Sequence, residues 1–222
     1  MFYNNNMTAN SITELADQIR HSPRPTGTKR IAEFAALRSF AFAGLFTEVF
    51  ACDGFCRLNQ GSEPPDYFLA TEAAKVSIEV TSFTTGRLEI YRRERPNPGR
   101  YTSMLRAKKP GKRFRNDIKA NRLPDDSDAV PHWENIGDLD HDYYEIACNG
   151  LKEKLARLAT YRSKYEKNFL LVHDKLSEFK SDFGRRIPIL RSMLNSIPRR
   201  LRFDAIVLVD GNHHSGATTV KL

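Results

Sequence analysis

The sequence has little cysteine and no long apolar run. Its three cysteines, Cys52, Cys56 and Cys148, are an odd number in a chain of 222 residues, which favours reduced thiols over a disulfide framework. Cys52 and Cys56 have no matching Cys or His pair nearby, so a zinc site is not expected. No stretch approaches the roughly 20 apolar residues that cross a bilayer. The polar start of the chain also lacks the apolar core of a secretory signal. We therefore expect a cytoplasmic protein without a membrane partner.

The positive charge of the chain is concentrated in one segment. The formal net charge is +8, yet residues 87–122 hold thirteen lysines and arginines against three acidic residues, a local net charge of +10. Tyr91, Tyr101 and Phe114 are interleaved with these charges, which suits phosphate contacts combined with base stacking. We expect a nucleic acid partner, with DNA as the first choice; an acidic protein partner or an inert insertion are the alternatives. The residues expected to contact the nucleic acid are Arg92, Arg93, Arg95, Arg106, Lys108, Lys109, Lys112, Arg113 and Arg115.

The first half of the chain predicts two helices and a group of short strands. Ser11 and Glu14 have the spacing of a capping box at the start of a short helix over 11–19. The segment 28–50 is rich in Ala, Leu and Phe on most sides, which predicts one largely buried helix. Three short strands, the last two forming a hairpin or meander, are expected at 54–58, 64–70 and 74–81.

The second half predicts alternating helices and strands after a basic insertion at about 84–133, which carries five prolines and no sustained periodicity. Helices are expected at 142–165 and 176–194, the second broken by Pro188, and strands at 168–173, 203–209 and 218–222. This order predicts an α/β fold with a mixed sheet. We divide the chain into an N-terminal helix and linker (1–27) and one domain (28–222).

Two carboxylates fall on neighbouring predicted strands. Asp66 follows two prolines at the start of one strand, and Glu79 lies in the middle of the next. Charge in such strands is costly to bury unless it has a role such as holding a cation. Alternatively, Asp66 begins a turn, and Glu79 faces solvent beside Ser77 and Thr81 on the polar side of a half-buried strand. The residues alone leave both interpretations open.

The order of elements and the spacing Pro65-Asp66…Glu79-x-Thr81 resemble the PD-(D/E)XK nuclease superfamily over residues 33–210. The motif itself is short and degenerate. The resemblance implies a restriction-endonuclease-like three-layer sandwich, in which a central mixed β-sheet is flanked by helices. It also implies a metal-dependent nuclease that hydrolyses phosphodiester bonds, with Mg²⁺ or Mn²⁺ as cofactor. Many nucleases of this fold act as dimers, so a homodimer is compatible with the resemblance.

Matched to the motif, Asp66 and Glu79 would be catalytic and would hold the metal together with the backbone carbonyl of Val80. The family often adds a glutamate from the first helix, for which Glu33 is the first choice and Glu48 the alternative. These ligands suit Mg²⁺, which prefers hard oxygen ligands and keeps waters, one of which can attack the phosphate.

The sequence departs from the family pattern at Thr81, where a lysine is expected. Such a lysine would orient the attacking water and stabilise charge on the phosphate, whereas a threonine hydroxyl can only hydrogen-bond. Some relatives carry this lysine on the following helix, and Lys154 is the candidate here; Lys152 would point about 200° away from it. Alternatively, Lys154 and Arg157 belong to a solvated helix face. The chain would then be a catalytically degenerate nuclease-fold protein that binds nucleic acid or regulates another protein.

Overall fold

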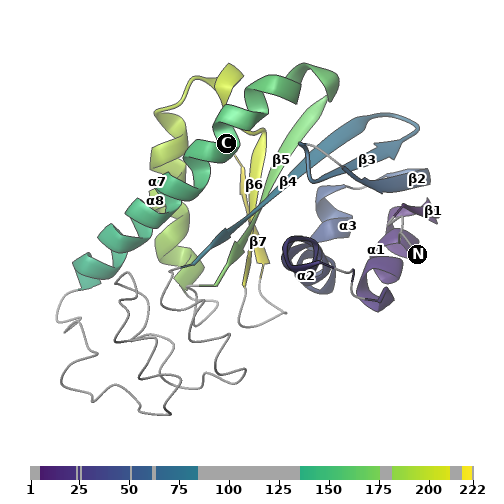
Figure 1. The fold of residues 1–222 in the computed structure, drawn as a ribbon, viewed down its shortest axis with the longest axis horizontal. Helices are drawn as coiled ribbons and strands as arrows, with labels where there is room; N and C mark the ends of the chain where they lie inside the picture. The colour runs from purple at the N-terminus through teal and green to yellow at the C-terminus, as the bar shows by residue number, and fades with distance from the viewer. Residues whose placement is uncertain are drawn as a thin grey trace, which may run out of the picture.

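The computed structural model describes residues 6–23, 25, 27–50, 52–61, 64–84, 136–175, 182–210 and 217–221. Its centre is a seven-stranded mixed sheet in which the strands lie in chain order (Figure 1). The first four strands pair antiparallel, the fourth to sixth pair parallel, and the seventh is antiparallel to the sixth. The strands are β1 (Met7–Ser11), β2 (Asp53–Gln60), β3 (Tyr67–Thr71), β4 (Lys75–Phe83), β5 (Lys167–Asp174), β6 (Ala205–Asp210) and β7 (Ala217–Lys221).

Helices cover both faces of this sheet. Alternate residues of a strand point to opposite faces, and the two hydrophobic clusters follow that alternation: Leu171 and Val207 pack on one face, Leu170 and Leu208 on the other. Figure 1 shows α1, α2 and α3 on the first side and α7 and α8 on the second. The predicted α/β class with a mixed sheet is confirmed. The helices are α1 (Ile12–His21), α2 (Thr28–Phe42), α3 (Leu45–Val49), α7 (Ile136–Tyr161) and α8 (Asp182–Asn195), with 3-10 turns at Arg162–Lys164 and Arg199–Leu201.

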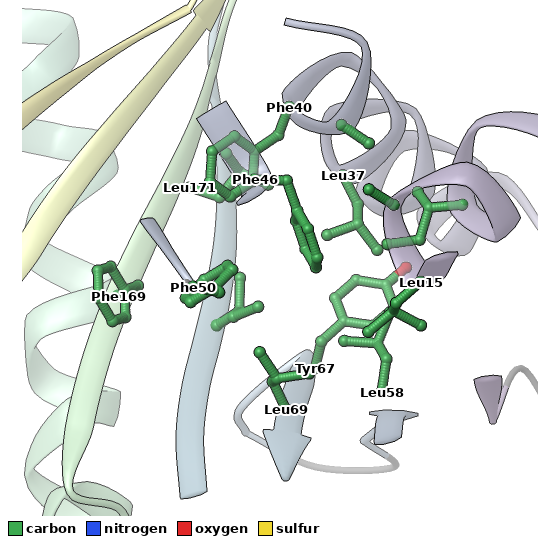
Figure 2. Packing of buried hydrophobic residues seen from close by; sticks show 14 of the residues in the cluster. Leu15, Leu37, Phe40, Phe46, Phe50, Leu58, Tyr67, Leu69, Phe169 and Leu171 are labelled. Atoms are coloured by element: carbon green, nitrogen blue, oxygen red, sulfur yellow. The ribbon is translucent and has the colours of Figure 1, made fainter. Parts of the chain in front are cut away.

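The single helix predicted over 28–50 is wrong, because the chain turns between α2 and α3. Gly44 takes the left-handed conformation with a φ of 79°, which residues with a Cβ rarely adopt. The turn brings the ring of Phe46 to 5.5 Å and that of Phe50 to 5.8 Å from the ring of Phe40, centre to centre. Phe50 also meets Phe169 of β5 edge to face at 5.1 Å, so the turn fastens both helices to the sheet (Figure 2).

The segment before residue 27 is part of the same core. β1 pairs with β2 at the edge of the sheet, and Leu15 and Ile19 of α1 are fully buried. The side chain of Ser11 accepts the backbone N–H of Glu14 at 3.1 Å, as the predicted capping box requires. The expected boundary at residue 27 therefore does not separate the described part of this segment from the rest of the fold.

Pro188 lies inside α8 and does not break it. The helix runs on to Asn195 although proline removes one intrahelical hydrogen bond. Leu190 and Leu194 are fully buried in the second hydrophobic cluster, and this packing holds the helix to the sheet. Among the described residues, no helix combines the length and apolarity needed to span a membrane.

Candidate active site

The site lies where strand β3 begins. The pairing of β3 with β4 joins Tyr67, the first residue of β3, to Ile78, so the antiparallel β4 runs on through Glu79 and Val80 past the start of β3. Asp66, the residue before β3, accepts the backbone N–H of Val80 on its Oδ2 at 2.8 Å. The N–H and C=O of one strand residue point to the same side. The carbonyl of Val80 therefore points to the same side of β4 as the Asp66 carboxylate.

Glu79 is buried within the sheet on the side covered by α7. Its side chain is 0% exposed, so the interpretation of Glu79 as a solvent-facing residue is wrong. Its Oε1 lies 2.6 Å from Nζ of Lys154, whereas its Oε2 has no hydrogen-bond partner among the described residues. Burial and the nearby Asp66 carboxylate raise the pKa of Glu79, although Lys154 and Arg157 act in the opposite direction.

Lys154 reaches both carboxylates from α7. In addition to the contact with Glu79, its Nζ lies 3.4 Å from Oδ2 of Asp66, and its side chain is only 11% exposed. The close approach of α7 to β4 depends on Gly150, which lies one helical turn before Lys154. A Cβ on Gly150 would lie 2.9 Å from Cε1 of Phe83. Lys152, by contrast, is exposed on the same helix, so of these two lysines it is Lys154 that enters the site.

Glu33 and Lys29 approach Asp66 from α2, which covers the face of the sheet opposite to α7. Nζ of Lys29 lies 3.4 Å from Oε1 of Glu33 and 3.9 Å from Oδ1 of Asp66. Burial and the Asp66 carboxylate raise the pKa of Glu33, while Lys29 opposes this effect. Glu48 is exposed on α3, so of the two candidate glutamates it is Glu33 that lies beside Asp66.

Arg157 and Tyr161 complete the α7 side of the site. Nη1 of Arg157 lies 3.9 Å from Oε1 of Glu79, and the same guanidinium hydrogen-bonds Glu153. Tyr161 is buried and its hydroxyl has no hydrogen-bond partner among the described residues. Burial, followed by the charges of Glu79 and Asp66, raises the pKa of Tyr161.

Six charged side chains are therefore linked by contacts through Asp66 and Glu79, and we call them the charge cluster. Sequence reasoning gave no role to Lys29, although its spacing of four residues from Glu33 on one helix indicates a side-chain pair. Arg157 was seen only as a companion of Lys154. The members of the charge cluster are Lys29, Glu33, Asp66, Glu79, Lys154 and Arg157.

The predicted nucleic-acid contacts lie elsewhere in the chain. All nine fall between residues 92 and 115, outside the residues that the structure describes. The candidate site is therefore defined by α2, by the start of β3, by β4 and by α7.

The charge cluster offers oxygen ligands of the type that Mg²⁺ prefers. Across the described part of the chain, no group of three or more His, Cys, Asp or Glu side chains is arranged to hold a metal ion. Mg²⁺, however, is commonly held by one or two carboxylates together with waters and substrate phosphates. Buried polar atoms normally have a partner, and Oε2 of Glu79 is one that has none among the described residues. The oxygens of Asp66 and Glu79 are therefore of the kind that a divalent cation binds.

Comparison of the chain with protein-family models, with curated proteins and with solved structures gives no match. The function is therefore inferred from the residues of the charge cluster and their surroundings.

Proposed function

We propose that this chain is a metal-dependent nuclease that hydrolyses phosphodiester bonds in DNA and belongs to the PD-(D/E)XK superfamily. The observation that carries the proposal is the convergence of two buried carboxylates on one lysine. Asp66 precedes β3, Glu79 lies on β4, and Lys154 reaches both from the helix that follows. Burying two carboxylates side by side is unfavourable for stability, and arrangements of this kind are frequent at catalytic centres.

The order of the elements supports the restriction-endonuclease-like fold. The helix α2, with the short α3 after it, is followed by the antiparallel meander β2–β4 and then by α7, β5, α8 and β6. This is the order on which the resemblance was based. Helices on both faces of a central mixed sheet are also what a three-layer sandwich requires.

The proposed roles follow from the positions of the side chains. Asp66, Glu79 and the carbonyl of Val80 would hold Mg²⁺ or Mn²⁺, which when bound lowers the pKa of a water and polarises a phosphoryl oxygen. Glu33, beside Asp66, would add a fourth oxygen or orient a water. The ammonium of Lys154 would donate to a phosphate oxygen and stabilise the negative charge that develops there.

Lys154 is suited to replace the lysine that the family pattern places at position 81. The part of α7 that carries Lys154 lies close to that position. A Cβ on Gly150 of α7 would be 3.9 Å from Oγ1 of Thr81, so this part of α7 passes directly over residue 81. Lys154 follows Gly150 by one turn and points the same way. A lysine moved from the strand to the helix can therefore still reach Glu79.

The proposal is tested by incubating the protein with plasmid and with single-stranded DNA in Mg²⁺, in Mn²⁺ and in a chelator. We expect cleavage by the wild type with either metal, loss of cleavage in Asp66→Asn and Lys154→Met, and none in the chelator. Lys152→Met is the matched control, because Lys152 is exposed on the same helix. Cleavage by Asp66→Asn at the wild-type rate would overturn the proposal.

One observation favours a second candidate, the catalytically degenerate protein that binds nucleic acid. The ammonium of Lys154 already lies between the two carboxylates and neutralises part of their charge. A folded wild type that binds DNA but cleaves neither substrate with either metal would establish this second function.

A further inference from the structure

We propose that Lys29 and Arg157 hold a phosphate of the nucleic acid backbone when a divalent cation binds the carboxylates of the charge cluster, so that cation and phosphate bind as a pair. This inference rests on the proposed function and adds to it a role for Lys29 and Arg157. It assigns these two residues and Lys154 as the ligands of the phosphate.

The first step of the argument is that the charge cluster neutralises itself. Its three carboxylates have a formal charge of −3 and its three cationic side chains +3. Every carboxylate has a cation within 3.9 Å: Lys29 contacts Glu33, Lys29 and Lys154 contact Asp66, and Lys154 and Arg157 contact Glu79. Charges this close interact strongly where they are also buried, as Lys154, Asp66 and Glu79 are. The resting site therefore has little net attraction for an ion of either sign.

A divalent cation on its own has to compete with Lys154. Its ammonium contacts one oxygen of each carboxylate, Oε1 of Glu79 and Oδ2 of Asp66. Oε2 of Glu79 is buried and unpartnered among the described residues, but one oxygen does not make a strong magnesium site. A metal that takes the two oxygens now held by Lys154 displaces its ammonium, which then needs a new anionic partner.

A phosphate on its own meets the opposite obstacle. Lys29, Lys154 and Arg157 would attract it, but each is within 3.9 Å of a carboxylate that repels it. When both ligands are present, the carboxylates can hold the metal and the cations can hold the phosphate. Lys154 has a flexible four-carbon stem, so its ammonium can move from one anion to the other.

Lys29 and Arg157 are placed to contact a nucleic acid strand from two sides. Lys29 projects from α2 and Arg157 from α7, helices that cover opposite faces of the sheet (Figure 1). Their side chains are 74% and 37% exposed, in contrast to the buried Lys154. They can therefore reach a ligand in solvent without rearrangement of the fold.

The inference predicts that metal and nucleic acid strengthen each other's binding. We would measure the affinity for Mn²⁺ from the electron paramagnetic resonance signal of the free ion. A short phosphorothioate oligonucleotide, which resists cleavage, would be absent or saturating. We expect the oligonucleotide to tighten Mn²⁺ binding about tenfold, within the range usual for coupled sites. By linkage, Mn²⁺ should tighten oligonucleotide binding by the same factor.

Variants separate this coupling from general electrostatics. Arg157→Met and Lys29→Met should each reduce the coupling and strengthen Mn²⁺ binding without oligonucleotide, because each removes a cation that partly neutralises the carboxylates. Lys152→Met, the control on the exposed side of α7, removes the same charge and should leave the coupling at the wild-type value.

Two results would overturn the inference, and they differ in what they mean for the proposed function. If the wild type cleaves DNA but binds Mn²⁺ equally well with and without oligonucleotide, the pairing is wrong and the nuclease stands. If Mn²⁺ does not bind under either condition and no DNA is cleaved, both the pairing and the nuclease are wrong.

Discussion

Nζ of Lys154 lies 2.6 Å from Oε1 of Glu79, and both side chains are largely removed from solvent. Removing one partner of a buried ion pair costs about 3–5 kcal/mol, because the other charge stays behind without compensation. The pair is therefore a structural element of the fold as well as part of the proposed catalytic site, and experiments have to separate the two roles.

Lys154→Met should lower the free energy of unfolding by about 3 kcal/mol at neutral pH in the absence of metal. Mn²⁺ should then stabilise the variant more than the wild type, because the ammonium no longer competes for the carboxylates. Urea unfolding with and without Mn²⁺ measures both effects. Lys152→Met should change stability by less than about 0.5 kcal/mol. An equally stable Lys154→Met protein would show that the pair contributes nothing to folding.

The pH dependence of stability should report the buried Glu79 carboxyl. Burial raises its pKa above the usual value, so the folded protein holds this proton more tightly than the unfolded chain. The stability that this group contributes is fully present below the unfolded pKa of 4.5 and is lost as the pH rises through the folded pKa. The loss cannot be steeper than about 1.4 kcal/mol per pH unit for one proton.

Glu79→Gln removes this titration while keeping an acceptor oxygen for Lys154. Relative to the wild type, the variant should therefore become more stable as the pH rises from about 4 to about 8. Urea unfolding in a chelating buffer across this range measures the difference. Parallel profiles for the two proteins would contradict the raised pKa. The variant should also lose cleavage at every pH.

Asp66 has a structural and a proposed catalytic role that two variants can separate. Its Oδ2 accepts the N–H of Val80, and the amide oxygen of Asp66→Asn can do the same, whereas Asp66→Ala leaves that donor buried and unpaired. We expect both variants to lose cleavage, and Asp66→Ala to be less stable than Asp66→Asn by about 1–3 kcal/mol. Equal stabilities in urea unfolding would show that the hydrogen bond to Val80 is not needed for folding.

Gly150 is a position of α7 where an added methyl group should be unfavourable. Gly150→Ala puts a Cβ 2.9 Å from the ring of Phe83 and should cost about 1–3 kcal/mol, because an overpacked contact has to be relieved. Displacement of α7 would also move Lys154, so cleavage should fall. Gly184→Ala in α8 is the matched control, since nothing lies within 4 Å of its Cβ. It should raise stability by about 0.5–1 kcal/mol through helix propensity, measured by urea unfolding.

Much of the sheet could be predicted because the strand patterns are local. The segment from Val76 to Val80 is rich in β-branched residues, and a short turn separates it from the preceding segment Tyr67–Thr71. The two segments therefore predict a simple hairpin, which brings Asp66 close to Glu79. Strand β1 was not predicted. Its sequence, Met7 to Ser11, has no strand pattern, and it is ordered by pairing with β2 far along the chain.

The candidate site was harder to predict than the sheet, because it depends on contacts between distant elements. Nothing local shows that Glu79 is buried under α7 or that Glu33 lies beside Asp66 while Glu48 is exposed. The turn at Gly44 decides the last point, since it ends α2 and places Glu48 on a separate helix. Lys154 could be named only through the family resemblance.

The connection between β4 and α7 divides the charge cluster unevenly along the chain. Lys29, Glu33, Asp66 and Glu79 precede it, whereas Lys154 and Arg157 follow it. Across this division, β4 and β5 pair in parallel over eight residues, from Val76 with Lys167 to Phe83 with Asp174. A chain cut between residues 84 and 136 would thus become a split protein. One fragment would carry all the carboxylates of the charge cluster, the other its two α7 cations, and joining them would restore the complete cluster.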